Sequence, residues 1–181
     1  MKTKSLILIL TMTILNSIVG QNVIKKFEAH GGAINKIKIS PDGTRIITAG
    51  ADARTNLWDA GSYKKLKIFK GYSENVEAVS FDNSAKYFIA EGSNGKLVLW
   101  DMFDFTPTKV LDCQGERIVN LSTDPFNKFV AGGTDKKVFV WDFNGNIEKT
   151  FEGFENPIVE FAFSPDGRYL LIGTENDLIT V

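Results

Sequence analysis

The stretches TNLWD (residues 55–59), KLVLWD (96–101) and KKVFVWD (136–142) decide the fold, because each ends in Trp-Asp after a short apolar run. The tryptophans of these stretches, Trp58, Trp100 and Trp141, are the three in the chain, and they are 42 and 41 residues apart. Repetition at a period of 40 to 45 residues indicates one structural unit repeated along the chain. We therefore predict that this chain of 181 residues is built from repeats.

Three further kinds of run accompany the Trp-Asp stretches, and their β-branched and aromatic residues predict strands. The runs just before them are IITAG from Ile46, YFIAEG from Tyr87 and KFVAGG from Lys128. The first runs of the units are INKIKIS from Ile34, VEAVSF from Val76, IVNLST from Ile118 and IVEFAFS from Ile158. Weaker runs follow, KKLKIF from Lys64, TKVL from Thr108 and NIEKTF from Asn146. With VIKKF from Val23 as an outer strand, we expect 16 strands in about four antiparallel four-stranded blades, an all-β β-propeller.

Turn residues separate the first two strands of each unit. SPDG occurs at residues 40–43 and 164–167, where Pro fixes φ and Asp and Gly accept the conformations that follow. DNSA at 82–85 and DPFN at 124–127 stand in the same place. We expect these two to form looser turns.

The repeated pattern resembles the WD-repeat (WD40-type) β-propeller family over essentially everything after Gln21. The resemblance implies that a full repeat is held by a buried, hydrogen-bonded set of His, Ser or Thr, Asp and Trp. The first repeat has all four, as the structural tetrad His30, Thr48, Asp52 and Trp58. These groups can satisfy one another, since indole only donates, a hydroxyl donates and accepts, and a carboxylate accepts. The lone histidine is therefore expected to be structural.

The later repeats keep the Trp-Asp signature but lose part of the polar set. The residues that define them are Trp100, Asp101, Asp135, Trp141 and Asp142. In the second repeat, Tyr72, Ala90 and Asn94 stand where the first has His, Thr and Asp. Loss of the hydroxyl is expected to be nearly neutral where the neighbours repack.

The repeats cover about residues 23–59, 64–101, 108–142 and 146–181, and the last stops one residue before its predicted Trp-Asp. Propellers of this family usually have seven blades, so we expect these blades to be part of a larger propeller, with gene erosion as the alternative. Four blades alone would leave an open arc or a strained ring. Self-association of two copies into an eight-bladed ring is a further hypothesis, because unpaired strand edges invite pairing.

The first twenty residues have the pattern of a signal peptide. Lys2 and Lys4 precede an apolar stretch from Leu6 to Leu15, and cleavage is expected near Gly20-Gln21. A membrane anchor is disfavoured, because the segment is short for crossing about 30 Å of hydrocarbon. We therefore expect residues 1–20 to be removed, residues 21–181 to form the blades without a membrane span, and the protein to be periplasmic or secreted.

Charge and residue chemistry exclude several functions. With 21 basic and 22 acidic residues the net charge is −1, and no basic stripe is long enough to follow phosphates, so nucleic acid is an unfavourable partner. One histidine and one cysteine cannot build a metal site or a nucleophile with its base. Cys113 is expected to be a small buried apolar residue, and GSNGK at 92–96 a turn. We expect no catalysis, cofactor or metal.

The family resemblance implies a non-catalytic scaffold for protein partners, which the sequence does not identify. Binding is expected on the face made by the loops that enter each first strand and the turns before each Trp-Asp strand. Candidate binding residues there are Tyr72, Glu74, Arg117 and Phe154, because aromatic and Arg side chains anchor many interfaces. For Tyr72 and Phe154, which replace the family histidine, packing between strands is the competing interpretation. The alternative functions are the recognition portion of a larger exported enzyme or sensor, and an incomplete fragment without function.

Overall fold

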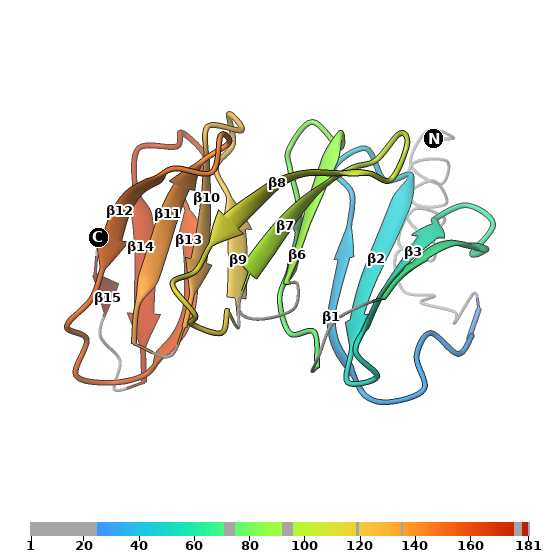
Figure 1. The fold of residues 1–181 in the computed structure, drawn as a ribbon, viewed down its shortest axis with the longest axis horizontal. Helices are drawn as coiled ribbons and strands as arrows, with labels where there is room; N and C mark the ends of the chain where they lie inside the picture. Colours follow the sequence, from blue (N-terminus) through green and yellow to red (C-terminus); the bar gives the residue numbers. More distant parts are fainter. Residues whose placement is uncertain are drawn as a thin grey trace, which may run out of the picture.

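Consecutive strands of the chain pair with one another to form four antiparallel sheets, which we call blades 1 to 4 (Figure 1). The computed structural model describes residues 25–70, 75–91, 96–118, 120–134, 136–175 and 179–180. Blade 1 comprises β1 (Ile34–Ile39), β2 (Arg45–Gly50), β3 (Arg54–Asp59) and β4 (Lys65–Phe69). Blade 2 comprises β5 (Val79–Phe81), β6 (Tyr87–Glu91), β7 (Lys96–Asp101) and β8 (Pro107–Asp112). Blade 3 comprises β9 (Asn120–Thr123), β10 (Phe129–Gly133), β11 (Val138–Asp142) and β12 (Ile147–Phe151), and blade 4 comprises β13 (Ile158–Phe163), β14 (Leu170–Thr174) and β15 (Ile179–Thr180).

The predicted all-β class and its antiparallel blades are confirmed, and the described residues contain strands and turns without a helix. One predicted strand is wrong. Residues 25–27 of VIKKF and the three residues after them form no strand, so the described residues contain 15 strands where 16 were expected. The reason is a competing contact, because the Phe27 ring packs on the rings of Trp58 and Tyr63, with centroids 4.9 and 6.1 Å apart. The segment therefore covers blade 1 and does not pair with a sheet edge.

The Trp-Asp stretches form the third strand of blades 1 to 3. A β-bulge lies beside each tryptophan, where the third strand pairs with the fourth: Leu57/Trp58, Leu99/Trp100 and Val140/Trp141. A bulge increases the local right-handed twist of the strand that contains it. The repeated tryptophan therefore marks the same twisted point of each complete sheet.

The turns after the first strands share one conformation. Gly43 and Gly167 of the SPDG turns have φ of +71° and +66°, and Ala85 and Asn127 of the other two turns have φ of +55° and +56°. The backbone hydrogen bond that closes the turn is nevertheless longer in the DNSA and DPFN turns, at 3.2 Å, than in the two SPDG turns, at 2.8 Å, as expected for looser turns. Asp82 takes the role that the serine has in SPDG. Its carboxylate accepts a hydrogen bond from the Tyr87 amide, five residues later, at 2.8 Å.

Apolar residues collect between neighbouring blades, giving three successive cores. Ile47, Leu57, Phe69, Val79 and Phe88 are among the residues buried between blades 1 and 2. Ile89, Leu97, Leu121, Phe139 and Trp141 are among those between blades 2 and 3, and Val138, Val140, Ile158, Phe161 and Ile172 lie between blades 3 and 4. Because side chains alternate along a strand, each sheet contributes one face to each neighbouring core.

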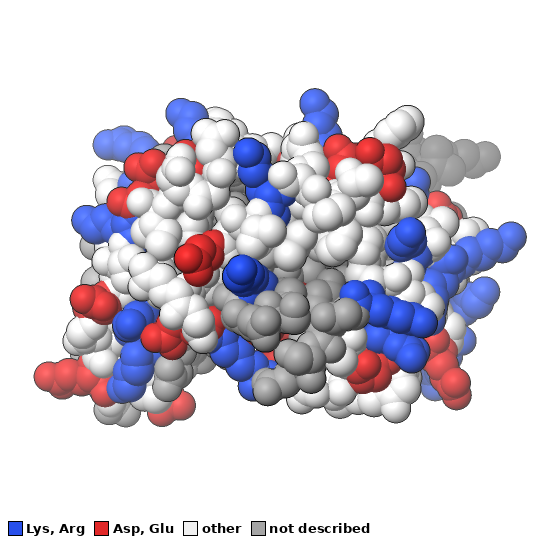
Figure 2. All heavy atoms as spheres, viewed as in Figure 1, with Lys and Arg blue, Asp and Glu red and all other residues white. Residues whose placement is uncertain are grey.

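The first strands of the blades line one edge of the assembly in chain order. Strand β1 contacts β5, β5 contacts β9, and β9 contacts β13. Among the described residues no contact of similar extent joins β13 back to β1, so the blades form an open arc (Figure 1). Figure 2 shows both signs of charge over the face seen in Figure 1, with Lys and Arg gathered on the right over blade 1.

Candidate functional site

The polar groups of blade 1 form a single hydrogen-bonded chain. The indole Nε1 of Trp58 donates to Thr48 Oγ1 at 3.0 Å, and Thr48 Oγ1 lies 2.8 Å from His30 Nε2. The other ring nitrogen of His30, Nδ1, lies 2.8 Å from Asp52 Oδ1, and Asp52 Oδ2 accepts from the Gly31 amide at 3.0 Å. The structure thus brings the four expected tetrad residues together.

One assignment of protons satisfies every member of this chain. If Nδ1 of His30 carries the proton, it donates to Asp52, and Nε2 accepts from the Thr48 hydroxyl, which accepts from Trp58. The imidazole is fully buried. No free ring nitrogen is left for a catalytic base, so the geometry suits a structural role.

The stability of this hydrogen-bonded tetrad depends on pH through the Asp52 carboxylate. Burial opposes ionisation, but the Gly31 amide and His30 outweigh it and hold the pKa of Asp52 below its ordinary 3.8. A carboxyl whose pKa is lower in the folded state stabilises the fold above its unfolded pKa, and this contribution disappears as the pH falls through the folded pKa.

We therefore expect Asp52→Asn to lower the free energy of unfolding most near pH 7. The difference from the unsubstituted chain should begin to shrink below about pH 4, where the unfolded carboxyl becomes protonated, and should be lost as the pH falls through the lower pKa of the folded state. Urea unfolding at a series of pH values measures both proteins. A difference that stays constant between pH 7 and pH 3 would contradict the assigned role.

The other two tryptophans have different surroundings. Trp141 is fully buried, and its Nε1 donates to the Asp112 carbonyl at 3.0 Å. Trp100 Nε1 is buried with no hydrogen-bond partner among the described residues, and Ala90 supplies no hydroxyl. The expected neutrality of the replacement stays a prediction, because Tyr72 of the same repeat lies outside the described residues. Asn94 and Asp135 lie outside the described residues.

The aspartates after the tryptophans close the turn to the fourth strand. Asp142 Oδ1 accepts from the amides of Asn144 and Asn146 at 2.9 and 2.8 Å, and Asp101 Oδ1 accepts from the Phe103 amide at 2.6 Å. The Asn146 amide in particular holds the pKa of Asp142 below its ordinary value. Both carboxylates thus have local roles in their turns.

Two of the candidate binding residues, Arg117 and Phe154, lie near the ends of the blades where the first strands begin, which we call the loop face. Arg117 Nη2 lies 2.8 Å from Glu77 Oε1, so this ion pair joins blade 3 to blade 2 at a solvent-exposed position. Phe154 is half-buried and packs against the core between blades 3 and 4. Tyr72 and Glu74 lie outside the described residues.

Glu91 is a residue that the sequence analysis missed. Its side chain is buried beside the pair, and its Oε2 accepts from the Glu77 amide at 3.4 Å. Burial raises the pKa of Glu91 to about 7, against the attraction of Arg117. Comparing the repeats would have revealed it, since the same place holds Ala49, Gly133 and Gly173 in the other blades. Glu77, Glu91 and Arg117 form what we call the acidic-arginine cluster.

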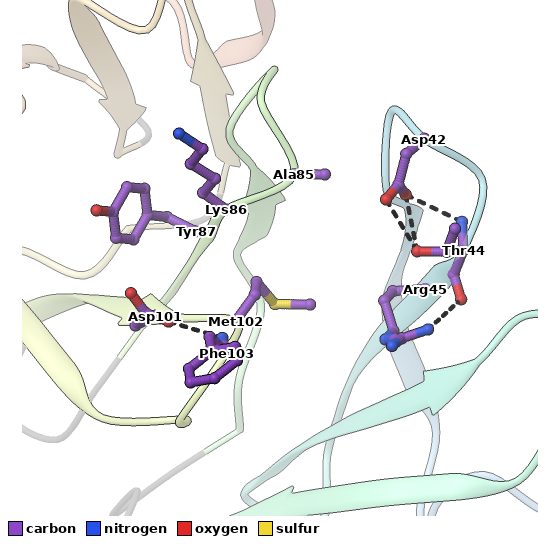
Figure 3. Close-up of a pocket in the computed structure, with 9 residues that line it drawn as sticks. All are labelled: Asp42, Thr44, Arg45, Ala85, Lys86, Tyr87, Asp101, Met102 and Phe103. Carbon is purple, nitrogen blue, oxygen red and sulfur yellow. Dashed lines mark hydrogen bonds between the residues drawn. The ribbon is translucent and has the colours of Figure 1, made fainter.

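A hollow of about 350 Å³ lies at the opposite end of blades 1 and 2 (Figure 3). The polar groups of its blade 1 side are bonded within that blade: Asp42 accepts from Thr44, and Arg45 donates to the Thr44 carbonyl and to Asp59 Oδ2. Figure 3 shows Lys86 and Tyr87 pointing away from the turn of blade 1. These groups do not converge on a shared point, so the hollow is a weaker candidate than the loop face.

No group of three His, Cys, Asp or Glu side chains is placed to hold a metal ion in the described ranges. No helix in the part of the chain that the structure describes is long and apolar enough to cross a membrane.

The open row of antiparallel blades and the tetrad define a repeat protein of the propeller class. The chain belongs to the WD-repeat family, whose model, described as WD domain, G-beta repeat, matches residues 21–59, 63–101, 105–142 and 145–181. Transcription initiation factor TFIID subunit 5 of Caenorhabditis elegans is 24% identical over 154 residues, which are 84% of this chain and 24% of that protein. Nuclear distribution protein nudF of Aspergillus niger is 25% identical over 155 residues, 82% of this chain and 29% of that protein. Pre-mRNA-processing factor 19 of Oryza sativa subsp. japonica is 27% identical over 149 residues, 78% of this chain and 28% of that protein. The chain thus spans about a quarter of the length of these relatives.

The relatives correct one prediction. A transcription initiation factor, a nuclear distribution protein and a pre-mRNA-processing factor are named for processes inside the cell, so the expected periplasmic or secreted location is wrong. The pattern of residues 1–20 carries no information about the repeats that follow them, and the relatives are matched through those repeats. The predicted signal peptide at residues 1–20 lies outside the described residues.

Proposed function

We propose that this chain is a non-catalytic scaffold that binds a protein partner through the acidic-arginine cluster on its loop face. The observation that carries the proposal is the exposed Arg117–Glu77 pair, which joins two blades at 2.8 Å. Arg is enriched in the interface positions that contribute most to binding, and its guanidinium pairs with carboxylates. The partner expected here presents a carboxylate to Arg117.

The reactive side chains of the described chain support a role without catalysis. His30 is enclosed in the tetrad. Cys113 is buried, and burial raises the pKa of its thiol to about 12, so it is not a thiolate near neutral pH. Binding is therefore the function that these residues favour.

Charge reversal at Arg117 tests the proposal. We expect Arg117→Glu to reduce recovery of a specific partner at least about tenfold, because it places like charges together and leaves Glu77 unpaired. Quantitative affinity capture from cell extract, followed by binding measurements with the purified partner, gives the effect.

Arg168→Glu is the matched control, since Arg168 is an exposed arginine in the turn of blade 4 at the opposite end of the strands. Capture should be unchanged with this variant, and thermal unfolding should show that both variants are folded. Partners retained by Arg117→Glu, or lost equally with Arg168→Glu, would overturn the proposed face.

A further inference from the structure

The fourth, outer strand of blade 1 differs in charge from the outer strands of blades 2 and 3. The stretch that contains it, KKLKIFK at residues 64–70, has four lysines and no acidic residue. The matching stretches are TPTKVLD at 106–112, with one Lys and one Asp, and NIEKTFE at 146–152, with one Lys and two Glu. Figure 2 shows Lys and Arg gathered over blade 1. The outer strand of blade 1 is therefore distinctly basic.

The folding of a blade does not require these lysines. One residue of each outer strand is paired with the tryptophan of its blade, and this register aligns the three stretches residue by residue. Lys70 is then matched by the acidic residues Asp112 and Glu152, and Lys64 is matched by uncharged residues in both blades. The same sheet thus forms with an acidic residue at the first position and an uncharged one at the second.

The side chains of Lys64, Lys65, Lys67 and Lys70 are all exposed. Residues 107–110 of β8 are exposed as well, although blade 2 packs against a blade on each side. The exposure of an outer strand is therefore independent of the blades beside it. Within the described ranges none of the four lysines takes part in an ion pair.

These lysines lie on both sides of their strand. Lys65 Nζ lies 4.7 Å from the centre of the Trp58 ring. Lys67 Nζ lies 5.9 Å from the centre of the Phe105 ring, which packs against the core between blades 1 and 2. Leu57 faces this core, and its neighbour Trp58 points to the other side, because side chains alternate along β3. Positive charge thus flanks the outer edge of β4 on both faces of the sheet.

The segment before blade 1 adds a fifth lysine to this surface. Phe27 packs on the rings of Trp58 and Tyr63. Lys25 Nζ lies 5.7 Å from the centre of the Tyr63 ring, and Lys65 lies over Trp58 in the same group of rings. We call the surface formed by Lys25, Lys64, Lys65, Lys67 and Lys70 the basic rim.

The basic rim follows a free strand edge. Among the described residues β4 pairs with β3 alone, and β8 and β12 likewise end their sheets. The N–H and C=O groups along such an edge can pair with an added strand. Lysines along the edge disfavour a second copy of the same strand, because like charges would meet, and they favour an acidic strand.

We propose that an extended acidic segment of a partner protein binds along β4, with its carboxylates against the basic rim. Side chains of an extended segment alternate between the two sides of a sheet, so they can reach Lys65 and Lys67 on opposite faces. A flat anionic membrane would meet the lysines of one side only, and it would leave the edge of the strand unpaired. The proposal is independent of the partner site at Arg117, which lies between blades 2 and 3.

Two fluorescein-labelled peptides of equal charge test the proposal with the full chain. The first repeats Glu-Glu-Thr three times, and the second repeats Glu-Glu-Pro three times and lacks the N–H at each proline. In fluorescence anisotropy at about 20 mM salt, we expect the threonine peptide to bind with a Kd below about 100 µM. Binding should weaken at least about tenfold at 200 mM salt, because screening reduces charge attraction, and the proline peptide should bind several-fold more weakly at both salt concentrations.

A double variant removes the charge that is particular to blade 1. Lys64→Asn with Lys70→Glu introduces the residues that blade 3 has at these positions, Asn146 and Glu152, so the sheet is expected to form. The threonine peptide should bind this variant at least about tenfold more weakly.

The matched control is Lys86→Asn with Lys128→Glu, which changes the net charge by the same amount. Both lysines are exposed and lie in turns of blades 2 and 3. Binding should be unchanged with this control, and thermal unfolding should show that both double variants are folded.

Four results would overturn the proposal. The first two are the absence of saturable binding to the unsubstituted chain and an equal loss of binding in the two double variants. The third is equal binding of the threonine and proline peptides, which would exclude pairing along the strand edge. The fourth is tighter binding to vesicles of phosphatidylserine and phosphatidylcholine, or to an oligothymidylate, because the rim would then recognise a lipid surface or a nucleic acid.

Discussion

Replacement of Trp141 by alanine is expected to lower the free energy of unfolding by about 3–5 kcal/mol, the range for loss of a large core aromatic residue. The indole is fully buried between blades 2 and 3, stacks on Phe139 with centroids 5.5 Å apart, and donates to the Asp112 carbonyl. The backbone is fitted to it, because a Cβ at Gly132 would lie 2.8 Å from the indole ring. The cavity left by alanine therefore cannot be filled by small shifts of one side chain.

Urea unfolding followed by far-ultraviolet circular dichroism measures this loss. Phe103→Ala is the control, because Phe103 is exposed, and it should change stability by less than about 0.5 kcal/mol. A loss of under about 1 kcal/mol for Trp141→Ala would mean that the core between blades 2 and 3 does not hold the arc together.

Thr48→Val is expected to cost about 2–4 kcal/mol, because it removes a hydroxyl and keeps almost the same shape. Trp58 Nε1 then loses its acceptor and His30 Nε2 its donor, and both atoms lie in the buried part of the tetrad. Each buried polar group left without a partner costs about 1–3 kcal/mol.

Thr48→Ser is the matched variant, since it keeps the hydroxyl and loses one methyl group. We expect it to cost less than about 1.5 kcal/mol in the same urea experiment. Equal losses for the valine and serine variants would show that the stability comes from packing at this position and that the hydrogen bonds contribute little.

The sequence predicted the strands of this fold well because the pairing is local. Each strand bonds to the next along the chain, so alternation and turn residues such as SPDG carry most of the information. The failure at VIKKF has the opposite cause. A run of residues with strand composition forms a strand only where it can pair with the free edge of a sheet. Here the Phe27 ring packs on Trp58 instead.

The candidate site was less predictable, because its contacts cross from one blade to another. Arg117 meets Glu77 only when blades 2 and 3 stand side by side, and nothing within either repeat indicates the pair. The polar set of blade 1 joins residues of one repeat, and the family pattern indicated it. Glu91 falls between these cases. It is buried, and comparing its repeat with the others shows that it is the one charged residue at this position.

The bulges beside Trp58, Trp100 and Trp141 recur although the tryptophans bond differently, to a hydroxyl, to no described partner and to a carbonyl. The same backbone geometry thus occurs with three different surroundings of the indole nitrogen. Since the apolar cores lie between consecutive blades, such a change has its main effect within one repeat and its neighbours. Duplication of a blade can therefore be followed by separate drift of each copy, and one copy can acquire a new surface while the others keep the arc intact.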